Sequence, residues 1–180
     1  EFSRVIALAV AKAEALHTMA WFSNLLNETL NTEMELHVSF SEDFGIERND
    51  LLNTKMSPTT YEYTTHLMNT AQKGTVVEIA TAILPCSWGY SEIGKHLYAK
   101  GVPQHAPLHA RWIEMYNSEE FAYLASWMRD YIDDRAKTLS SSSLDKLQNI
   151  FLISSIYEGK FWESAYRMEQ WDETSGQLNI

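Results

Sequence analysis

Cys86 and Tyr90 form the pair of residues in this sequence that is best placed to do chemistry. They lie four positions apart in the stretch LPCSWGY (residues 84–90), so on a helix both side chains project from one face. The proline before Cys86 lacks a backbone donor and is expected to kink a helix, which can leave a thiol facing a cavity. A thiolate there would be a nucleophile. The alternative is structural, because a free cysteine often packs as a small hydrophobic side chain.

Glu158 is the second candidate, in the stretch YEGKFWE (residues 157–163). The apolar residues around it predict a largely buried helix: Ile150, Phe151, Ile153, Ile156 and Phe161. Burial of a poorly compensated carboxylate raises its pKa, which suits general acid catalysis. The structural alternative is a partly exposed Glu158 that pairs with a neighbour. Glu163 is the competing carboxylate and is expected to be the more exposed of the two.

A third set of residues, Glu33, Glu35 and His37 with His17 upstream, has the side chains of a metal site. Glu33 and His37 are four positions apart and could share an ion. A carboxylate-bridged pair of metal ions in a helical bundle, however, uses Glu-x-x-His motifs on two helices. Only Glu14 and His17 have that spacing, and the sequence has no Gly-rich phosphate loop or dinucleotide fingerprint. We therefore predict neither a metal nor another cofactor.

Aromatic side chains are abundant, with six Trp, nine Tyr and seven Phe. Those that could line a pocket and stack on a flat ring are Tyr63, Trp88, Tyr90, Tyr116, Phe161 and Trp162. Aromatic residues at helical spacing are also common in an ordinary core, so their presence alone does not separate a pocket from packing.

The charge of the chain argues against a nucleic acid or an anionic membrane as its partner. Lys and Arg number 14 and Asp and Glu number 24, which gives a formal charge of −10; both of these partners require clustered positive charge. The single cysteine excludes an intramolecular disulfide and a cysteine-based zinc site, and it fits a reducing, cytoplasmic location. No apolar stretch approaches ~18 residues, so no membrane span is expected.

Helices are the elements expected to position these residues. Gly (7) and Pro (4) together are well below the roughly 12% average, which favours long helices over a turn-rich β-sandwich. Periodicity and capping residues, such as Ser57 before Pro58, predict one all-α domain over residues 1–180 with about seven helices. They are expected near residues 2–15, 18–40, 58–74, 75–100, 107–116, 118–139 and 144–168, with a loop at 43–53.

Several stretches, in order along nearly the whole chain, together resemble the TenA family of thiaminase II or aminopyrimidine aminohydrolases. They are EMELH (33–37), PTTYEYT (58–64), LPCSWGYSEIG (84–94), WIEMY (112–116), EEF (119–121) and YEGKFWESAY (157–166). Agreement of several spaced motifs is more specific than any one of them. The resemblance implies a haem-oxygenase-like helical bundle that binds no haem and is usually a homotetramer.

The resemblance also implies an activity and its residues. Members replace the aminomethyl nitrogen of 4-amino-5-aminomethyl-2-methylpyrimidine with water and return the hydroxymethyl pyrimidine for thiamin salvage; many also cleave thiamin. By resemblance, Cys86 matches the nucleophile and Glu158 the acid/base carboxylate. Tyr90 matches the tyrosine that hydrogen-bonds near the cysteine.

The substrate pocket implied by the resemblance contains Tyr63 and Tyr116, with Phe161 stacked on the ring. The family also has an N-terminal helical segment whose Asp and aromatic residue grip the aminopyrimidine. We expect this chain to lack that segment, because residues 1–4 align just after it. The departure motivates one alternative, a relative that binds a pyrimidine or another flat ring without turnover. A metal-dependent oxidase on the same scaffold is the other.

Overall fold

The computed structural model describes residues 1–172, and over this range it consists of helices without a β-strand. This confirms the predicted all-α class. The helices are α1 (Phe2–Lys12), α2 (Leu16–Glu28), the π-helical turn η1 (Thr29–Glu33), α3 (Met34–Asp43), α4 (Arg48–Asn53), α5 (Pro58–Lys73), α6 (Val76–Lys100), α7 (Pro107–Tyr116), α8 (Glu119–Ala136) and α9 (Ser141–Tyr166). Within this part of the chain, none of the helices is both long and apolar enough to span a bilayer.

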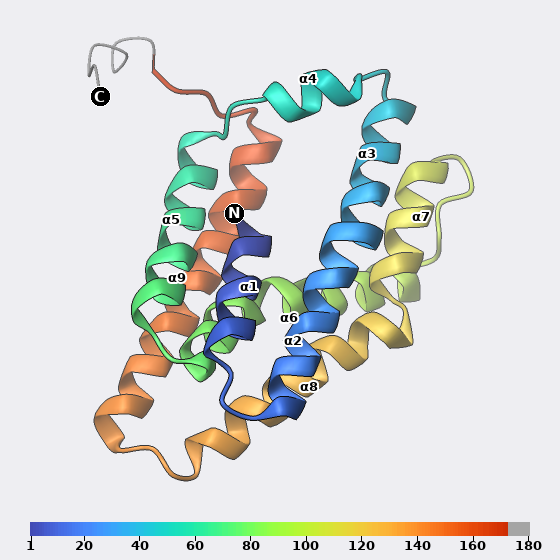
Figure 1. Ribbon diagram of the computed structural model, residues 1–180. Helices are drawn as coiled ribbons and strands as arrows, with labels where there is room; N and C mark the ends of the chain where they lie inside the picture. Colours follow the sequence, from blue (N-terminus) through green and yellow to red (C-terminus); the bar gives the residue numbers. More distant parts are fainter. Residues whose placement is uncertain (173–180) are drawn as a thin grey trace.

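Helix α6 is the central element of the bundle. It passes behind the other helices in Figure 1 and packs against α1, α5, α7, α8 and α9. Every residue from Ile79 to Pro85 is buried, and the helix continues through Pro85 to Lys100. On the near side, α1 packs against α2 and α5, while α4 bridges the top of the bundle between α3 and α5 (Figure 1). The residues that follow Pro85 on α6 are therefore held from several sides.

The hydrophobic core joins α6 to the helices around it. Val5 of α1, Phe22 of α2, Leu67 of α5, Ile79 of α6 and Met128 of α8 are all buried in this one cluster. Each of the surrounding helices contributes an apolar stripe and turns its polar residues outward, which is the pattern of an amphipathic helix. The apolar spacing that predicts helices in the sequence thus also identifies the faces that meet in the core.

The outer face of α9 differs from the sequence prediction of a largely buried helix. Ile150 is buried and Phe151 is half-buried, but Ile153 and Ile156 are 42% and 51% exposed. Helix α9 packs against α5 and α6 on one side and lies at the edge of the bundle (Figure 1). The apolar residues of α9, with exposed Leu152 among them, therefore exceed what the core of this chain covers.

Several helix boundaries also differ from the prediction; α9, for example, begins at Ser141 and not at residue 144. The expected loop at 43–53 contains α4, whose first turn holds Asp50, a favourable place for a carboxylate beside the positive end of the helix dipole. The helix expected over 18–40 begins at Leu16 and includes η1, because a single wider turn does not register in a 3.6-residue pattern. Residues 1–172 thus contain nine α-helices and one π-helical turn in place of about seven helices.

Three hydrogen bonds fix the start of α5, the helix that carries Tyr63. The Ser57 hydroxyl accepts a hydrogen bond from the Thr60 amide, and Pro58 occupies the first turn, which confirms the predicted helix start. From the other end of the sequence, the Glu169 carboxylate accepts hydrogen bonds from the Thr59 amide (2.9 Å) and hydroxyl (3.1 Å). The segment after α9 is thereby attached to the first turn of α5.

Candidate active site

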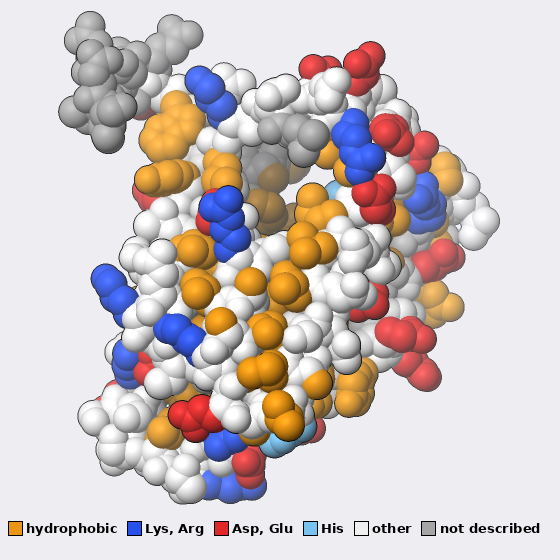
Figure 2. Space-filling view, in the orientation of Figure 1, with side chains coloured by type: hydrophobic (Ala, Val, Ile, Leu, Met, Phe, Trp, Pro, Cys, Tyr) orange, Lys and Arg blue, Asp and Glu red, His pale blue; other side chains and the backbone are white. Residues whose placement is uncertain are grey.

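Residues from five elements converge beside the middle of α6. They are Cys86 and Tyr90 of α6, Glu158 of α9, Tyr63 of α5, Tyr116 of α7 and Glu33 of η1. Figure 2 shows that the near face of the molecule is hollowed below α4. The helix formed by η1 and α3 borders this hollow on one side, and α5 and α9 border it on the other (Figures 1 and 2).

The thiol of Cys86 lies among acidic groups. The residue keeps partial exposure, but burial of the thiol raises its pKa well above the usual value, and the negative charges of Glu158 and Glu33 raise it further. Among residues 1–172, no basic side chain acts in the opposite direction on this thiol. The surroundings of Cys86 therefore favour the thiol over the thiolate, and its activation requires a proton acceptor or a nearby positive charge.

Glu158 is placed to be that proton acceptor. Its Oε1 accepts a 2.6 Å hydrogen bond from Tyr63 Oη, and it also lines a groove of about 260 Å³ between α6 and α9. Burial raises the pKa of Glu158, and hydrogen bonds from Tyr63 and Cys86 offset part of that rise. A carboxylate of this kind can accept a proton and later return it. Glu163 is exposed, as predicted, and pairs with Arg167 at the surface.

The three tyrosines of the site keep their phenol protons and can therefore donate hydrogen bonds. Burial is the largest cause that raises the pKa of Tyr63, Tyr90 and Tyr116 far above the ordinary value of 10.0, so all three phenols stay protonated at physiological pH. Tyr116 Oη donates to Glu33 Oε1 at 3.2 Å. The rings of Tyr90 and Tyr116 meet edge-on with centroids 4.9 Å apart. The polar ends and the rings together can hold a flat ligand that carries acceptor atoms.

Phe161 lies three positions after Glu158 on α9, and within residues 1–172 no ring contact joins it to Tyr63, Tyr90 or Tyr116. It packs half-buried against the hydrophobic core, and its ring meets that of Trp162 edge-on at 6.5 Å. Trp162 in turn lies 5.3 Å from Tyr90 and 6.0 Å from Trp112, measured between ring centroids. In the described part of the chain, the aromatic neighbours of Tyr90 are thus Trp112 and Trp162, together with Tyr116, and no ring contact joins Tyr90 to Phe161.

Glu33 belongs to the site, although the sequence singles it out only within a candidate metal set that the motif spacing disfavours. Its Oε1 is 3.9 Å from His37 Nε2, whereas Glu35 pairs with Arg48 at the surface. Residues 1–172 contain no cluster of three or more His, Cys, Asp or Glu side chains that could hold a metal ion. The contact that places Glu33 in the site is its hydrogen bond with Tyr116, a residue 83 positions away. Local spacing carries no signal for such a contact.

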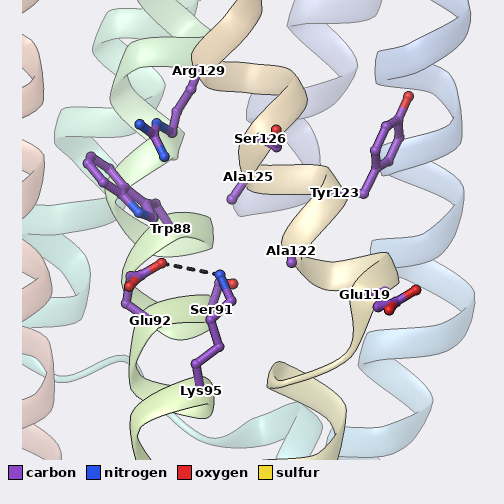
Figure 3. Close-up of a pocket in the computed structure, with 10 residues that line it drawn as sticks. All are labelled: Trp88, Ser91, Glu92, Lys95, Glu119, Ala122, Tyr123, Ala125, Ser126 and Arg129. Carbon is purple, nitrogen blue, oxygen red and sulfur yellow. Dashed lines mark hydrogen bonds and ion pairs between the residues drawn. The ribbon is translucent and has the colours of Figure 1, made fainter.

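A second groove, of about 470 Å³, lies between α6 and α8 (Figure 3). There the Arg129 guanidinium lies 4.3 Å above the Trp88 ring, and Lys95 pairs with Glu92. At 3.6 residues per turn, two positions along an α-helix rotate the side chain by about 200°, so the face of α6 that carries Trp88 points away from Cys86. The groove in Figure 3 contains none of the six site residues, and its Trp88 and Glu92 also line the smaller groove beside Glu158.

Comparisons with known proteins match nearly the whole chain. The family model described as TENA/THI-4/PQQC family matches residues 1–168. An aminopyrimidine aminohydrolase of Halalkalibacterium halodurans is 40% identical over 174 residues, which is 96% of this chain and 77% of the relative. An aminopyrimidine aminohydrolase of Helicobacter pylori is 32% identical over 168 residues, 93% of this chain and 77% of the relative. The solved structure of a TenA homologue from P. horikoshii OT3 has a TM-score of 0.81 and 28% identity, over 92% of this chain and 76% of that one.

These similarities agree with the motifs quoted from the sequence. The solved homologue confirms the TenA-type helical fold that the motifs imply. The two aminohydrolase relatives confirm the expectation that the chain is an enzyme of the hydrolase class. The chain belongs to the TENA/THI-4/PQQC family.

Proposed function

We propose that the protein is a thiamin salvage hydrolase that converts 4-amino-5-aminomethyl-2-methylpyrimidine into the hydroxymethyl pyrimidine. The observation that carries the proposal is the meeting of Cys86 from α6 with Glu158 from α9, whose carboxylate is held by Tyr63. The names of the aminopyrimidine aminohydrolase relatives support the same reaction. Cleavage of thiamin is proposed as a second activity of this site.

The reaction exchanges one C–N bond for one C–O bond. The Cys86 sulfur adds to an electron-poor carbon of the pyrimidine ring, and the thiol proton passes to Glu158. The aminomethyl group, bound as its ammonium ion, then leaves as ammonia while the ring adduct forms an exocyclic double bond, and Glu158 passes the thiol proton to the departing ammonia. Water adds to the exocyclic carbon and returns a proton to Glu158, and the ring expels the sulfur, which recovers that proton. The sum is aminomethyl pyrimidine plus water giving hydroxymethyl pyrimidine plus ammonia.

The aromatic side chains bind the substrate in this scheme. Tyr90 is proposed to hydrogen-bond close to Cys86, and Tyr63 and Tyr116 donate hydrogen bonds from phenols that stay protonated at physiological pH. Phe161 is proposed to stack on the pyrimidine ring. The position of Trp162 beside Tyr90 makes that indole a second stacking surface, so Phe161→Ala and Trp162→Ala should be compared for their effect on KM.

We further propose that the chain forms a homotetramer in the cytoplasm. Three neighbouring apolar side chains on α9, Leu152, Ile153 and Ile156, are exposed in the single chain and support a contact with another copy. A lone cysteine, Cys86, suits a reducing compartment. Sedimentation equilibrium tests the assembly, and a monomer mass at micromolar concentration would contradict it.

The direct test is release of hydroxymethyl pyrimidine from the aminomethyl pyrimidine and, in parallel, from thiamin. Cys86→Ser should abolish turnover while thermal unfolding and circular dichroism stay unchanged; near-normal turnover would remove Cys86 from the mechanism. Binding of the pyrimidine without product would favour a binding relative instead. Activity that a chelator removes and iron or manganese restores would favour a metal-dependent oxidase.

A further inference from the structure

We infer that the site around Cys86 selects a positively charged ligand, and that Glu33 supplies the second of the two carboxylates that hold this charge. The inference rests on the proposed function and adds the charge of the substrate class to it: a flat ring that carries an ammonium group or another cation. It also gives Glu33 a part in the reaction that is distinct from proton transfer by Glu158.

Two carboxylates approach Cys86 from different elements. Glu158 comes from α9, and Glu33 comes from η1 on the other side of the hollow in Figure 2. A phenol orients each of them: Tyr63 Oη donates to Glu158 at 2.6 Å, and Tyr116 Oη donates to Glu33 at 3.2 Å. The charges of both glutamates act on the Cys86 sulfur. The thiol is therefore exposed to negative potential from two sides.

The site has little positive charge of its own to balance these carboxylates. Over residues 1–172, no Lys, Arg or His forms an ion pair with Glu158. The basic partner of Glu33 is His37, which is 3.9 Å away and 44% exposed. Arg48 of α4 and Arg111 of α7 pair with other acidic residues at the surface. A cationic ligand would neutralise the carboxylates, whereas a neutral ligand leaves their charge uncompensated and an anion is repelled.

A bound cation would also activate Cys86. The two glutamates disfavour the thiolate, and a positive charge within a few ångströms offsets their effect and moves the thiol pKa back towards neutrality. The nucleophile would then become reactive when the substrate arrives, and it would stay a less reactive thiol at other times. Glu33 contributes to this through its charge, while Glu158 transfers the proton.

The experiment must separate the charge of Glu33 from its hydrogen bond with Tyr116. Glu33→Gln keeps an oxygen that can accept from Tyr116 but removes the charge. Glu33→Asp keeps the charge and should retain most of the effect. Glu35→Gln is the matched control, because Glu35 is two positions along, exposed, and paired with Arg48 away from the site. Thermal unfolding of each variant shows whether the fold is intact.

The first test uses Cys86, the single cysteine of the chain, as a reporter. Its reaction rate is measured by mass spectrometry with cationic 2-aminoethyl methanethiosulfonate and with neutral methyl methanethiosulfonate. The ratio of the two rates cancels the thiolate fraction and reports the local potential. We expect this ratio to exceed that of free cysteine by about tenfold, to fall about fivefold in Glu33→Gln and to stay within about twofold in Glu35→Gln. A ratio that Glu33→Gln leaves unchanged overturns the inference.

The second test measures binding without turnover, by calorimetry in a Cys86→Ser background. Adding Glu33→Gln should weaken binding of the aminomethyl pyrimidine, an ammonium ion at neutral pH, by about tenfold. Binding of the neutral hydroxymethyl pyrimidine should weaken by less than about threefold. Equal losses for both ligands would mean that Glu33 only positions Tyr116, which overturns the charge role. If neither pyrimidine binds the Cys86→Ser chain, the proposed function fails, and the ratio of the thiosulfonate rates still decides the inference.

Discussion

Tyr63 Oη donates a 2.6 Å hydrogen bond to Glu158 Oε1 and so connects α5 to α9 across the site. The ring of Tyr63 is itself held by Tyr157, which stacks on it with centroids 5.5 Å apart and an interplanar angle of 12°. Packing thus orients the phenol, and the phenol orients the carboxylate. The pair sets both the direction in which Glu158 can transfer a proton and the pH range in which it can accept one.

Tyr63→Phe is expected to move the acid limb of the pH profile to higher pH. The hydrogen bond from Tyr63 favours the ionised carboxylate, so its loss raises the pKa of Glu158 further above the ordinary value. Ionised Glu158 is the proton acceptor in the proposed reaction, so kcat/KM should begin to rise at a higher pH. The measurement is kcat/KM from about pH 4 to about pH 9. An acid limb that does not move would show that this hydrogen bond leaves the titration of Glu158 unaffected.

Glu158→Gln is expected to slow turnover by at least about 100-fold, because the amide keeps the shape of the side chain but cannot carry the proton. Glu163→Gln is the matched control: Glu163 lies on the same helix, is exposed and pairs with Arg167. Steady-state kinetics of the two variants under identical conditions check the prediction. A loss below about tenfold in Glu158→Gln, or similar losses in both variants, would assign Glu158 a structural role.

Glu158→Gln should also stabilise the fold at neutral pH. Because burial raises the pKa of Glu158, the folded state holds the proton more tightly than the unfolded chain, whose carboxyl titrates near about 4.3. The stability gained from the protonated form is present below that value and is lost as the pH rises through the folded pKa. The Tm of Glu158→Gln should therefore match that of the parent at acidic pH and exceed it at neutral pH. A Tm difference that is independent of pH would contradict this linkage.

Glu169 should show the opposite pH dependence. A hydrogen bond from the Thr59 amide is the first cause that lowers the pKa of Glu169, so the unfolded chain holds the proton more tightly than the folded one. This stabilisation is present above the unfolded pKa and is lost as the pH falls through the folded value. Glu169→Gln should lower Tm at neutral pH, with a difference that shrinks below about pH 4. Thermal unfolding at both pH values checks this, and a Tm equal to that of the parent at neutral pH would rule it out.

A methyl group at Gly94 should force α6 and α7 apart. A Cβ there would lie 2.6 Å from the carbonyl carbon of Tyr116 and 2.7 Å from its oxygen, and this backbone cannot move aside without shifting α7. Gly94→Ala should cost about 2 kcal/mol or more of unfolding free energy. Gly89→Ala is the control on the same helix, where a Cβ meets nothing within 4 Å, and it should stabilise by about 0.5–1 kcal/mol. Denaturant unfolding of both variants measures the two changes in unfolding free energy. Equal changes would mean that the close approach of α7 to Gly94 does not destabilise the alanine variant.

Local spacing predicts part of the site well. Cys86 and Tyr90 lie four residues apart on one helix, and the sequence pattern alone places them on the same face. The start of α5 follows from Ser57 and Pro58 for the same reason, since capping is a property of adjacent residues. The meeting of Cys86 with Glu158 is not of this kind, because it depends on how α6 and α9 pack. The resemblance to a family indicated that pair, and periodicity did not.

The features that the sequence did not predict depend on tertiary structure. Helix α4 is only six residues long, and so short a helix depends on its surroundings more than on its own propensity. The exposure of Ile153 and Ile156 depends on which elements cover α9, and composition gives no information on that. Glu33 enters the site through its contact with Tyr116 of α7, which no local pattern of carboxylate and histidine reveals.

The π-helical turn η1 makes the number of residues between α2 and α3 as important as their types for the direction in which the following side chains point. Each residue of an α-helix rotates the next side chain by about 100°. Phe22 before the turn and Val38 after it are both buried, while Glu33 at its end reaches Tyr116. A π-helical turn holds one residue more than the α-helical turn it replaces, so deleting the exposed Asn31 should convert η1 into α-helix and keep Phe22 and Val38 facing the core. Inserting a residue there should instead rotate one of them out of place. A mutational scan of this segment should therefore tolerate exchanges of residue type and a single-residue deletion, and reject single-residue insertions.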